Sequence, residues 1–130
     1  MAQAKDLVTL GVPAEVAKRT GLRLLSVTTT STSQNSGGVL VGPGNIFVDV
    51  TPHASNGAIT LPSNADLGDM IVVNNNDGTN AVQVYPQTGG TIQSGSANTK
   101  QGVAAKITAI FIKWSATNWK CVLGAAATPA

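Results

Sequence analysis

Hydrophobic and polar positions alternate in short runs along most of the chain. Between residues 58 and 123, runs rich in β-branched side chains are separated by polar segments that contain Gly and Asn. Such runs predict β-strands, because β-branched side chains fit a pleated, half-buried surface. The five strands predicted in this region are Ala58–Leu61, Asp69–Asn74, Ala81–Tyr85, Lys106–Trp114 and Asn118–Leu123.

The region before residue 58 continues the same pattern. Leu24–Thr32, Val39–Val41 and Ile46–Val50 are β-prone, and Gly42-Pro43-Gly44 and Asn56-Gly57 are typical of turns. Strands that recur roughly every ten residues without a helical period indicate antiparallel sheets. The predicted fold is therefore all-β, a small antiparallel β-sandwich or barrel that is jelly-roll-like.

Three connections in this fold have distinct predicted forms. Residues 74–80 predict a long hairpin loop, and residues 115–117 a tighter one. Residues 87–101, rich in Gly, Ser, Thr and Asn around Thr91-Ile92, predict an exposed excursion.

The N-terminal segment differs from the rest. Residues 13–21 begin with Pro13, carry Glu15 early and Lys18 and Arg19 late, and end at Gly21, which predicts a short helix. A helix of about two turns is marginal alone, so it must dock either on its own domain or, as an arm, on another protein. The predicted organisation is an arm with a short helix at residues 1–23 and a β-sandwich or barrel body at residues 24–130.

The strand at Lys106–Trp114 is apolar on both faces. One face carries Ile107, Ala109, Phe111 and Lys113, and the other carries Thr108, Ile110, Ile112 and Trp114. An antiparallel sheet usually exposes one polar face to water. This strand therefore lies between two packed layers, or a neighbouring subunit covers one of its sides.

Bulk properties exclude several classes of protein. A chain of 130 residues predicts one domain, and the net charge of +2 is too small to indicate nucleic-acid binding. Cys121 is the only cysteine, so no internal disulfide forms. No apolar run is long enough to span a membrane, and the N-terminus lacks the apolar core of a secretory signal.

Charge is unevenly distributed along the chain. Residues 1–23 carry a net +2, residues 24–99 a net −4 and residues 100–130 a net +4. Strand pairing within one chain explains this distribution if it brings the middle and the end together. Alternatively, the opposite charges set the register between neighbouring subunits.

The residues needed for catalysis or metal binding are missing from the sequence. His53 is the only histidine and lies in a predicted loop, and one His with Cys121 does not complete a zinc site. The segment Asn74–Gly78 fails the EF-hand pattern because Val73 and Val84 occupy ligand positions. We predict no enzyme activity, no catalytic residue, no metal and no cofactor. Tyr85, Trp114 and Trp119 could stack on sugars if exposed, although packing in the core or an interface is the simpler reading.

Several segments occur in an order that resembles the β-modules of head-decoration (cement) proteins, head fibres and tail fibres of tailed bacteriophages. A second, shorter similarity to the openings of phage head-fibre and decoration proteins covers Leu10–Ala17. The segments of the β-module similarity are Ile59–Pro62, Gly68–Asn75, Asn80–Pro86, Gly90–Ile92, and the Phe111 strand with Asn118–Lys120.

This resemblance implies a structural virion protein. The implied molecule is a homotrimer that binds the outer surface of a phage head, stabilises contacts between major capsid protein subunits, and is made in the host cytoplasm. Its partners are then the major capsid protein and itself, with no nucleic acid and no membrane. The chain has no shaft repeats, which favours a capsid decoration protein over a tail fibre. The alternative is a fibre or adhesin module that binds host-surface glycans through Trp119, Tyr85 and the polar loops.

The resemblance also leads to two hypotheses about contact residues. We expect the arm to contact the capsid and the Phe111 strand to contribute to the trimer interface. The capsid-contact residues are Leu7, Leu10, Val12, Pro13, Val16, Lys18 and Arg19. The trimer-interface residues are Ile110, Phe111, Ile112 and Trp114.

Overall fold

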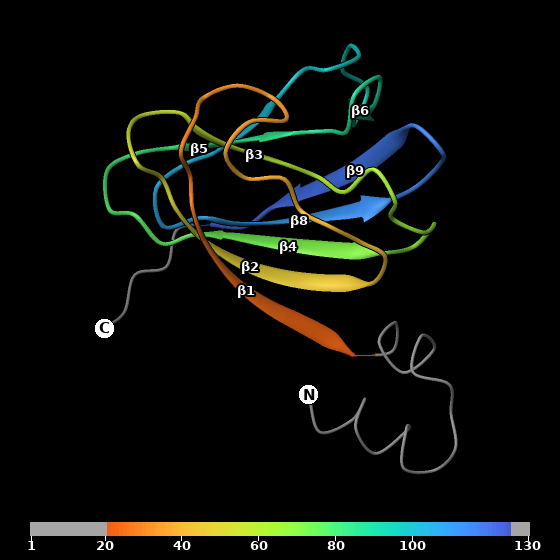
Figure 1. Cartoon of the computed structure of the whole chain (residues 1–130), viewed down its shortest axis with the longest axis horizontal. Coiled ribbons are helices and arrows are strands. Elements are labelled where there is room, and N and C mark those ends of the chain that lie inside the picture. Colours follow the sequence, from red (N-terminus) through yellow and green to blue (C-terminus); the bar gives the residue numbers. More distant parts are fainter. Residues whose placement is uncertain (1–20, 126–130) are drawn as a thin grey trace.

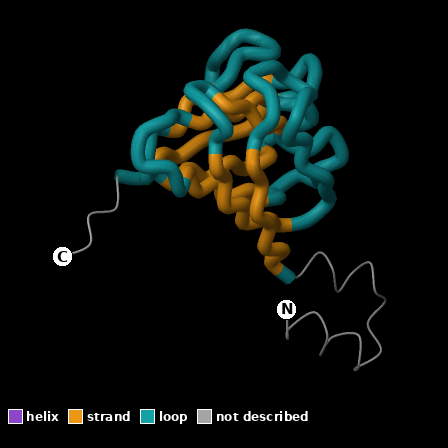
Figure 2. The backbone as a smooth tube through the Cα atoms, turned by 60° about the vertical axis from the view of Figure 1, so that its left-hand side comes forward, coloured by secondary structure: helices purple, strands orange, loops and turns teal. Residues whose placement is uncertain are grey.

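The computed structural model describes residues 21–125, and these residues form strands and loops without a helix (Figures 1 and 2). Nine strands follow one another along the chain. They are β1 (Leu22–Thr28), β2 (Asn45–Thr51), β3 (Gly57–Thr60), β4 (Met70–Asn75), β5 (Val82–Tyr85), β6 (Thr91–Ile92), β7 (Gln101–Val103), β8 (Thr108–Lys113) and β9 (Asn118–Leu123).

The first five strands form a solenoid-like coil. From β2 to β8 the chain alternates between a larger sheet and a smaller one, and β1, β2 and β4 lie parallel in the larger sheet while β3 and β5 lie parallel in the smaller. Ile46 pairs with Ile71, and Gly57 pairs with Val82, so these strands are offset by 25 residues from one turn to the next, whereas the β1–β2 pairing of Leu22 with Asn45 has an offset of 23. Figure 1 shows β1, β2 and β4 side by side in chain order.

The last four strands complete both sheets. β8 pairs antiparallel with β4, β9 pairs antiparallel with β8, and the short β6 lies beside β9. In the smaller sheet, β7 pairs antiparallel with β5. The strand orders are therefore β1-β2-β4-β8-β9-β6 in the six-stranded sheet and β3-β5-β7 in the three-stranded sheet.

The core lies between the two sheets. In β2, β4 and β8 buried positions alternate with partly exposed ones, as expected when every second side chain points inward. The largest fully buried side chains include Trp119, Phe111, Ile46, Ile59 and Leu61. Burial of these apolar side chains supplies the main driving force for folding.

The all-β class and seven of the strand positions agree with the sequence analysis, whereas the predicted antiparallel sandwich or barrel is wrong, and the β-prone segment Val39–Val41 forms only an isolated bridge from Val39 to Thr60. The coil stacks parallel strands, and loops alone connect them. β4 lies in the larger sheet and β5 in the smaller one, so they are not hairpin partners, and the long hairpin loop predicted at residues 74–80 is instead a crossover between sheets. The predicted helix at residues 13–21 lies outside the described residues except for Gly21.

Local turn chemistry follows the sequence more closely. The predicted turn at Asn56-Gly57 is present, with Asn56 in the left-handed region at a φ of 63°. The β8–β9 hairpin is also present, where the amide of Trp114 donates to the carbonyl of Asn118 at 3.0 Å. Within the predicted excursion, Thr91-Ile92 forms β6 and Gln101 begins β7, a strand that the polar composition there did not indicate.

Candidate functional site

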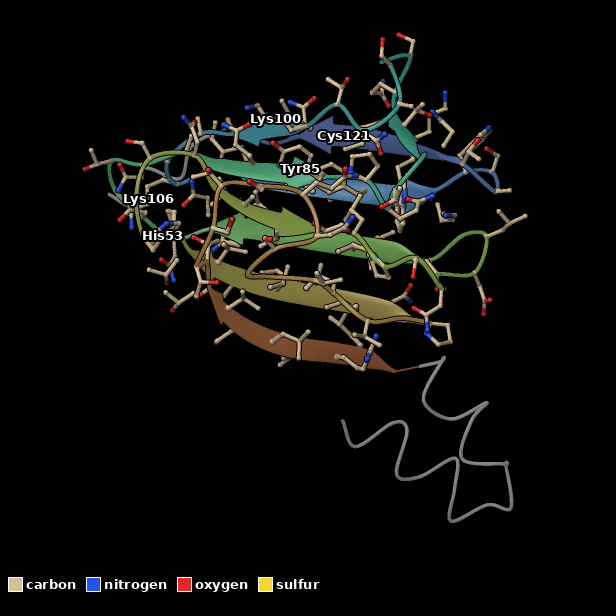
Figure 3. All side chains as sticks on the ribbon, turned by 45° about the horizontal axis from the view of Figure 1, so that its top comes forward. His53, Tyr85, Lys100, Lys106 and Cys121 are labelled. Atoms are coloured by element: carbon tan, nitrogen blue, oxygen red, sulfur yellow. The ribbon has the colours of Figure 1, made fainter. Side chains whose placement is uncertain are left out.

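The polar side chains capable of chemistry come from different elements of the described fold. His53 lies in the loop after β2, Lys106 precedes β8 and Cys121 lies on β9, as Figure 3 shows. The His53 ring nitrogen Nδ1 is 2.7 Å from the Thr29 hydroxyl, an interaction that ties its loop to the end of β1. Among residues 21–125, no group of three or more His, Cys, Asp or Glu side chains is arranged to hold a metal ion.

Cys121 is not an activated thiol. Burial raises its pKa to about 11, because a thiolate is poorly solvated there. Its backbone amide donates to Oε1 of Gln93 at 2.7 Å. A thiol with this pKa is protonated at neutral pH and is a weak nucleophile, so Cys121 acts as a partly buried packing residue.

Lys113 is the charged side chain that points into the core. It is only 4% exposed, and its Nζ lies 5.0 Å from the ring centroid of Trp119. The Trp119 indole Nε1 in turn donates to Oε1 of Gln87 at 2.8 Å. Burial lowers the pKa of Lys113, since the ammonium loses hydration that a cation–π contact replaces only in part.

Trp119 is not available to bind sugar. It is fully buried, so the hypothesis that it stacks on a glycan is wrong. Tyr85 is partly buried, and its hydroxyl lies 3.4 Å from the carbonyl oxygen of Thr32. Trp114 is the exposed indole, with Nζ of Lys120 at 5.9 Å from its ring centroid.

The most distinctive surface is the outward face of the six-stranded sheet. Cross-strand pairing places one apolar residue from each of five adjacent strands in a continuous row, and a second row beside it is mostly apolar. The first row is Leu24, Phe47, Val72, Ile110 and Val122. The second row contains Leu22, Met70 and Ile112. We call these eight side chains the outer apolar face.

Side chains of the outer apolar face are only partly shielded. Leu24 and Val122, at the two ends of the first row, are 67% and 58% exposed. Phe47, Val72 and Ile110, between them, are intermediate because neighbours in the row cover their flanks. A row of this kind on a single chain is typical of a surface that packs against another molecule.

A polar ladder borders the outer apolar face at the end where β2 and β4 finish. The side-chain amide of Asn74 donates to Oδ1 of Asp49 at 2.7 Å, and the Thr108 hydroxyl donates to Oδ1 of Asn74 at 2.7 Å. The Asn76 amide donates to Oδ2 of Asp49 at 2.8 Å, so both carboxylate oxygens accept a hydrogen bond. The ladder ties three neighbouring strands together and gives the apolar rows a polar rim.

The structure separates the four residues of the trimer-interface hypothesis. Ile110 and Ile112 belong to the outer apolar face, and Trp114 is exposed just beyond β8. Phe111 points the other way and is fully buried in the core, where it supports the fold and not an interface. The capsid-contact residues Leu7, Leu10, Val12, Pro13, Val16, Lys18 and Arg19 all lie outside the described residues.

Sequence reasoning missed the members of the face that come from other strands. Leu24, Phe47 and Val72 each lie in a strand with apolar side chains on both faces, which is the signal that could have placed them opposite the core. Their alignment into one row depends on parallel pairing between strands 23 to 25 residues apart. Alternation within a single strand does not reveal that pairing.

Comparisons with known proteins add no family assignment. No protein-family model matches the chain, and neither the curated proteins nor the solved structures contain a significant match. Within the described part of the chain, no helix has the length and hydropathy needed to cross a bilayer. The interpretation of function therefore depends on the outer apolar face and on the residues of the sequence.

Proposed function

We propose that this chain is a non-enzymatic structural protein of a phage virion, a decoration protein that binds the outside of the head as a homotrimer and stabilises contacts between major capsid protein subunits. The observation that carries the proposal is the outer apolar face, which spans five strands. The resemblance of the strand segments to phage β-modules supplies the biological context.

The dimensions of the face indicate how much of an interface it can supply. Five strands about 4.8 Å apart, with two rows about 6.6 Å apart along the strands, cover about 300 Å² in projection. A stable protein–protein interface buries about 800 Å² on each partner. The face can therefore form the apolar centre of a subunit contact, and the exposed side chain of Trp114 extends the surface available beside it.

A modest footprint suits a protein that binds in several copies. When three linked copies engage equivalent sites on a shell, the second and third contacts form at high effective concentration. Each contact with the capsid then need not be strong. We propose that the arm at residues 1–23 makes this contact through the seven residues named above, while the outer apolar face joins the copies.

The oligomeric mass of the purified protein tests the self-association. The double substitution Ile110→Asp and Ile112→Asp places two charges in the outer apolar face and should convert the trimer to monomer or aggregate. A matched control carries the same two charges at exposed loop positions, as Ala104→Asp and Ala116→Asp, and should remain a trimer. Light scattering measures both. A trimer of unchanged mass in the first variant contradicts the proposed interface.

Cosedimentation with heads that lack the protein tests the binding partner. The wild type should sediment with the heads, and Val16→Asp with Lys18→Glu and Arg19→Glu should remain in the supernatant while keeping its oligomeric mass. A control with Gln3→Glu should still bind. Wild-type protein that binds a glycan array and ignores heads would favour the adhesin alternative, for which Trp114 offers an exposed ring.

A further inference from the structure

β1 is the one long open strand edge among the described residues. The opposite edge of the six-stranded sheet consists of the two-residue β6 and, beyond it, residues 120–123 of β9, and the β7 edge has three residues. The β3 edge is covered, since the amide of Ala58 donates to the carbonyl of Ser31 at 2.8 Å and that of Thr60 to Gly38 at 2.7 Å. β1 has seven residues, all in register with β2 on one side.

The outer edge of β1 lacks the features that usually keep strand edges apart. Proteins protect such edges with proline, bulges or charged side chains. β1 contains no proline, and its pairing with β2 is unbroken. Its single charged side chain, Arg23, is turned back on its own chain, where Nη2 donates to the carbonyl of Val41 at 2.5 Å. Leu24 and Leu25 are left exposed.

We propose that residues 7–10 of the same chain pair antiparallel with β1 and form an additional edge strand of the six-stranded sheet. The proposed register places Val8 opposite Leu24 and Leu10 opposite Leu22. Val8 then extends the row of Leu24, Phe47, Val72, Ile110 and Val122 by one strand. This pairing does not require phage heads, although Leu7 and Leu10 also belong to the proposed capsid-contact residues.

The sequence of residues 7–10 suits this position. Leu7-Val8-Thr9-Leu10 is uncharged, contains two β-branched residues and lacks proline. In the proposed register, alternation places Val8 and Leu10 on the outer face, while Leu7 and Thr9 lie on the side of Leu25 and Arg23. A strand edge paired in this way is no longer open to strands of other molecules.

The length and attachment of the N-terminal segment favour it over a separate molecule. Its last residue, Thr20, is followed by Gly21 and then by Leu22, the first residue of β1. Residues 11–21 connect Leu10 to Leu22, and they must span only the roughly 4.8 Å between adjacent strands. Eleven residues reach up to about 36 Å when extended, so they can reverse the chain direction. Covalent attachment also gives the segment a high effective concentration at the edge.

Hydrogen exchange of the backbone amides tests the pairing. It is monitored by NMR on the full chain, with no phage heads present. Amides of alternate β1 residues point toward β2 and away from it. We expect both sets to exchange about 100-fold more slowly than exposed loop amides. If only the alternate amides that face β2 are protected in the wild type, the proposal is overturned.

Two proline variants identify which segment protects the edge. Val8→Pro removes a backbone donor and distorts residues 7–10, so the outward-facing β1 amides should lose their protection while those facing β2 keep it. Gln3→Pro is the control and should leave both sets protected. The fluorescence of buried Trp119 verifies that each variant is folded. Unchanged protection in Val8→Pro overturns the proposal.

Disulfide trapping tests the register and the identity of the chain. In a Cys121→Ser background, Val8→Cys with Leu24→Cys should form a disulfide within one chain, because directly opposite residues meet the required Cα separation of about 4.4 to 6.8 Å. Val8→Cys with Leu25→Cys is the control and should stay reduced, since Leu25 faces the other side. A disulfide that joins two chains, or none in the first variant, overturns the proposal.

Discussion

Ile110 and Phe111 are adjacent on β8, yet their side chains lie on opposite sides of the six-stranded sheet. Phe111 is fully buried between the two sheets, whereas Ile110 stands in the outward row between Val72 and Val122. The strand is therefore apolar on both faces for two separate reasons. One face completes the core of the chain, and the other forms part of a surface that we propose contacts a second copy.

This relationship predicts that replacing either of the two neighbouring side chains by alanine affects a different property, stability for Phe111 and self-association for Ile110. Phe111→Ala should lower the free energy of unfolding by about 3 to 5 kcal/mol, because it leaves a cavity in the core. Ile110→Ala should change the free energy of unfolding of the separated subunits little and should weaken self-association. Urea denaturation at a protein concentration low enough to dissociate the oligomer measures the first effect, and sedimentation measures the second. Equal destabilisation of the separated subunits by both changes would contradict this division.

A close backbone approach at Gly57 gives a second prediction. A Cβ added at Gly57 would collide with the Thr29 hydroxyl, which also accepts a hydrogen bond from the His53 amide at 2.9 Å. Gly57→Ala should therefore destabilise the chain by about 1 to 3 kcal/mol, the usual cost of overpacking. Gly78→Ala is the matched control, since the Cβ added there would lie 4.0 Å from Cε of Lys106. Thermal denaturation compares the two, and similar melting temperatures would argue against the collision.

The polar ladder predicts an energetic coupling between neighbouring strands. Asn74→Ala removes the amide that bonds Asp49 and the carbonyl that accepts from Thr108. The expected cost is about 1 to 3 kcal/mol, since partly buried partners lose hydrogen bonds. A double-mutant cycle with Asp49→Ala should give a non-additive result, because the two residues share a contact. Additive single effects would show that the Asn74–Asp49 bond contributes nothing measurable.

The buried ammonium of Lys113 predicts that stability rises with pH. Its pKa in the folded chain is below the ordinary lysine value of 10.5, so between these two values the unfolded chain binds more protons. The free energy of unfolding must then increase as the pH rises through that window. In a Cys121→Ser background, Lys113→Met should remove this rise. Lys120→Met is the control at an exposed lysine and should retain it.

Cys121 predicts the opposite dependence on pH. Its pKa is about 11 in the folded chain against an ordinary cysteine value of 9.0, so the thiol loses its proton at lower pH in the unfolded chain. The free energy of unfolding should fall as the pH rises from about 9 to about 11, and Cys121→Ser should abolish this fall in a Lys113→Met background. Denaturation curves across this range measure the difference. A thiolate absorbance that appears near pH 9 in the folded chain would contradict the raised pKa.

Strand positions could be predicted from the sequence because alternation and turn residues are local signals. Ile46–Val50, Asp69–Asn74 and Asn118–Leu123 each coincide with an observed strand to within a few residues. Their assignment to sheets could not be predicted in the same way. Parallel pairing of β2 with β4 joins residues 25 positions apart, and a loop that crosses between sheets has the same polar composition as a hairpin loop.

The outer apolar face could be predicted only in part for the same reason. The double apolar character of Lys106–Trp114 indicated that one side needs a partner, and Ile110 and Ile112 do lie on the outward side. The sequence alone did not distinguish that side from the side of Phe111. The distinction depends on which face meets the smaller sheet, and this follows from contacts between residues distant in the chain.

The 25-residue offset of the coil has a consequence for how chains of this kind can grow. Duplication of the stretch from β2 to the residue before β4 would insert one more parallel strand into each sheet, with inward and outward positions still in phase. An insertion of any other length at the same place would have to be absorbed in a loop. Taller or shorter versions of the molecule are thus accessible through changes of one whole winding, each adding about 4.8 Å of height.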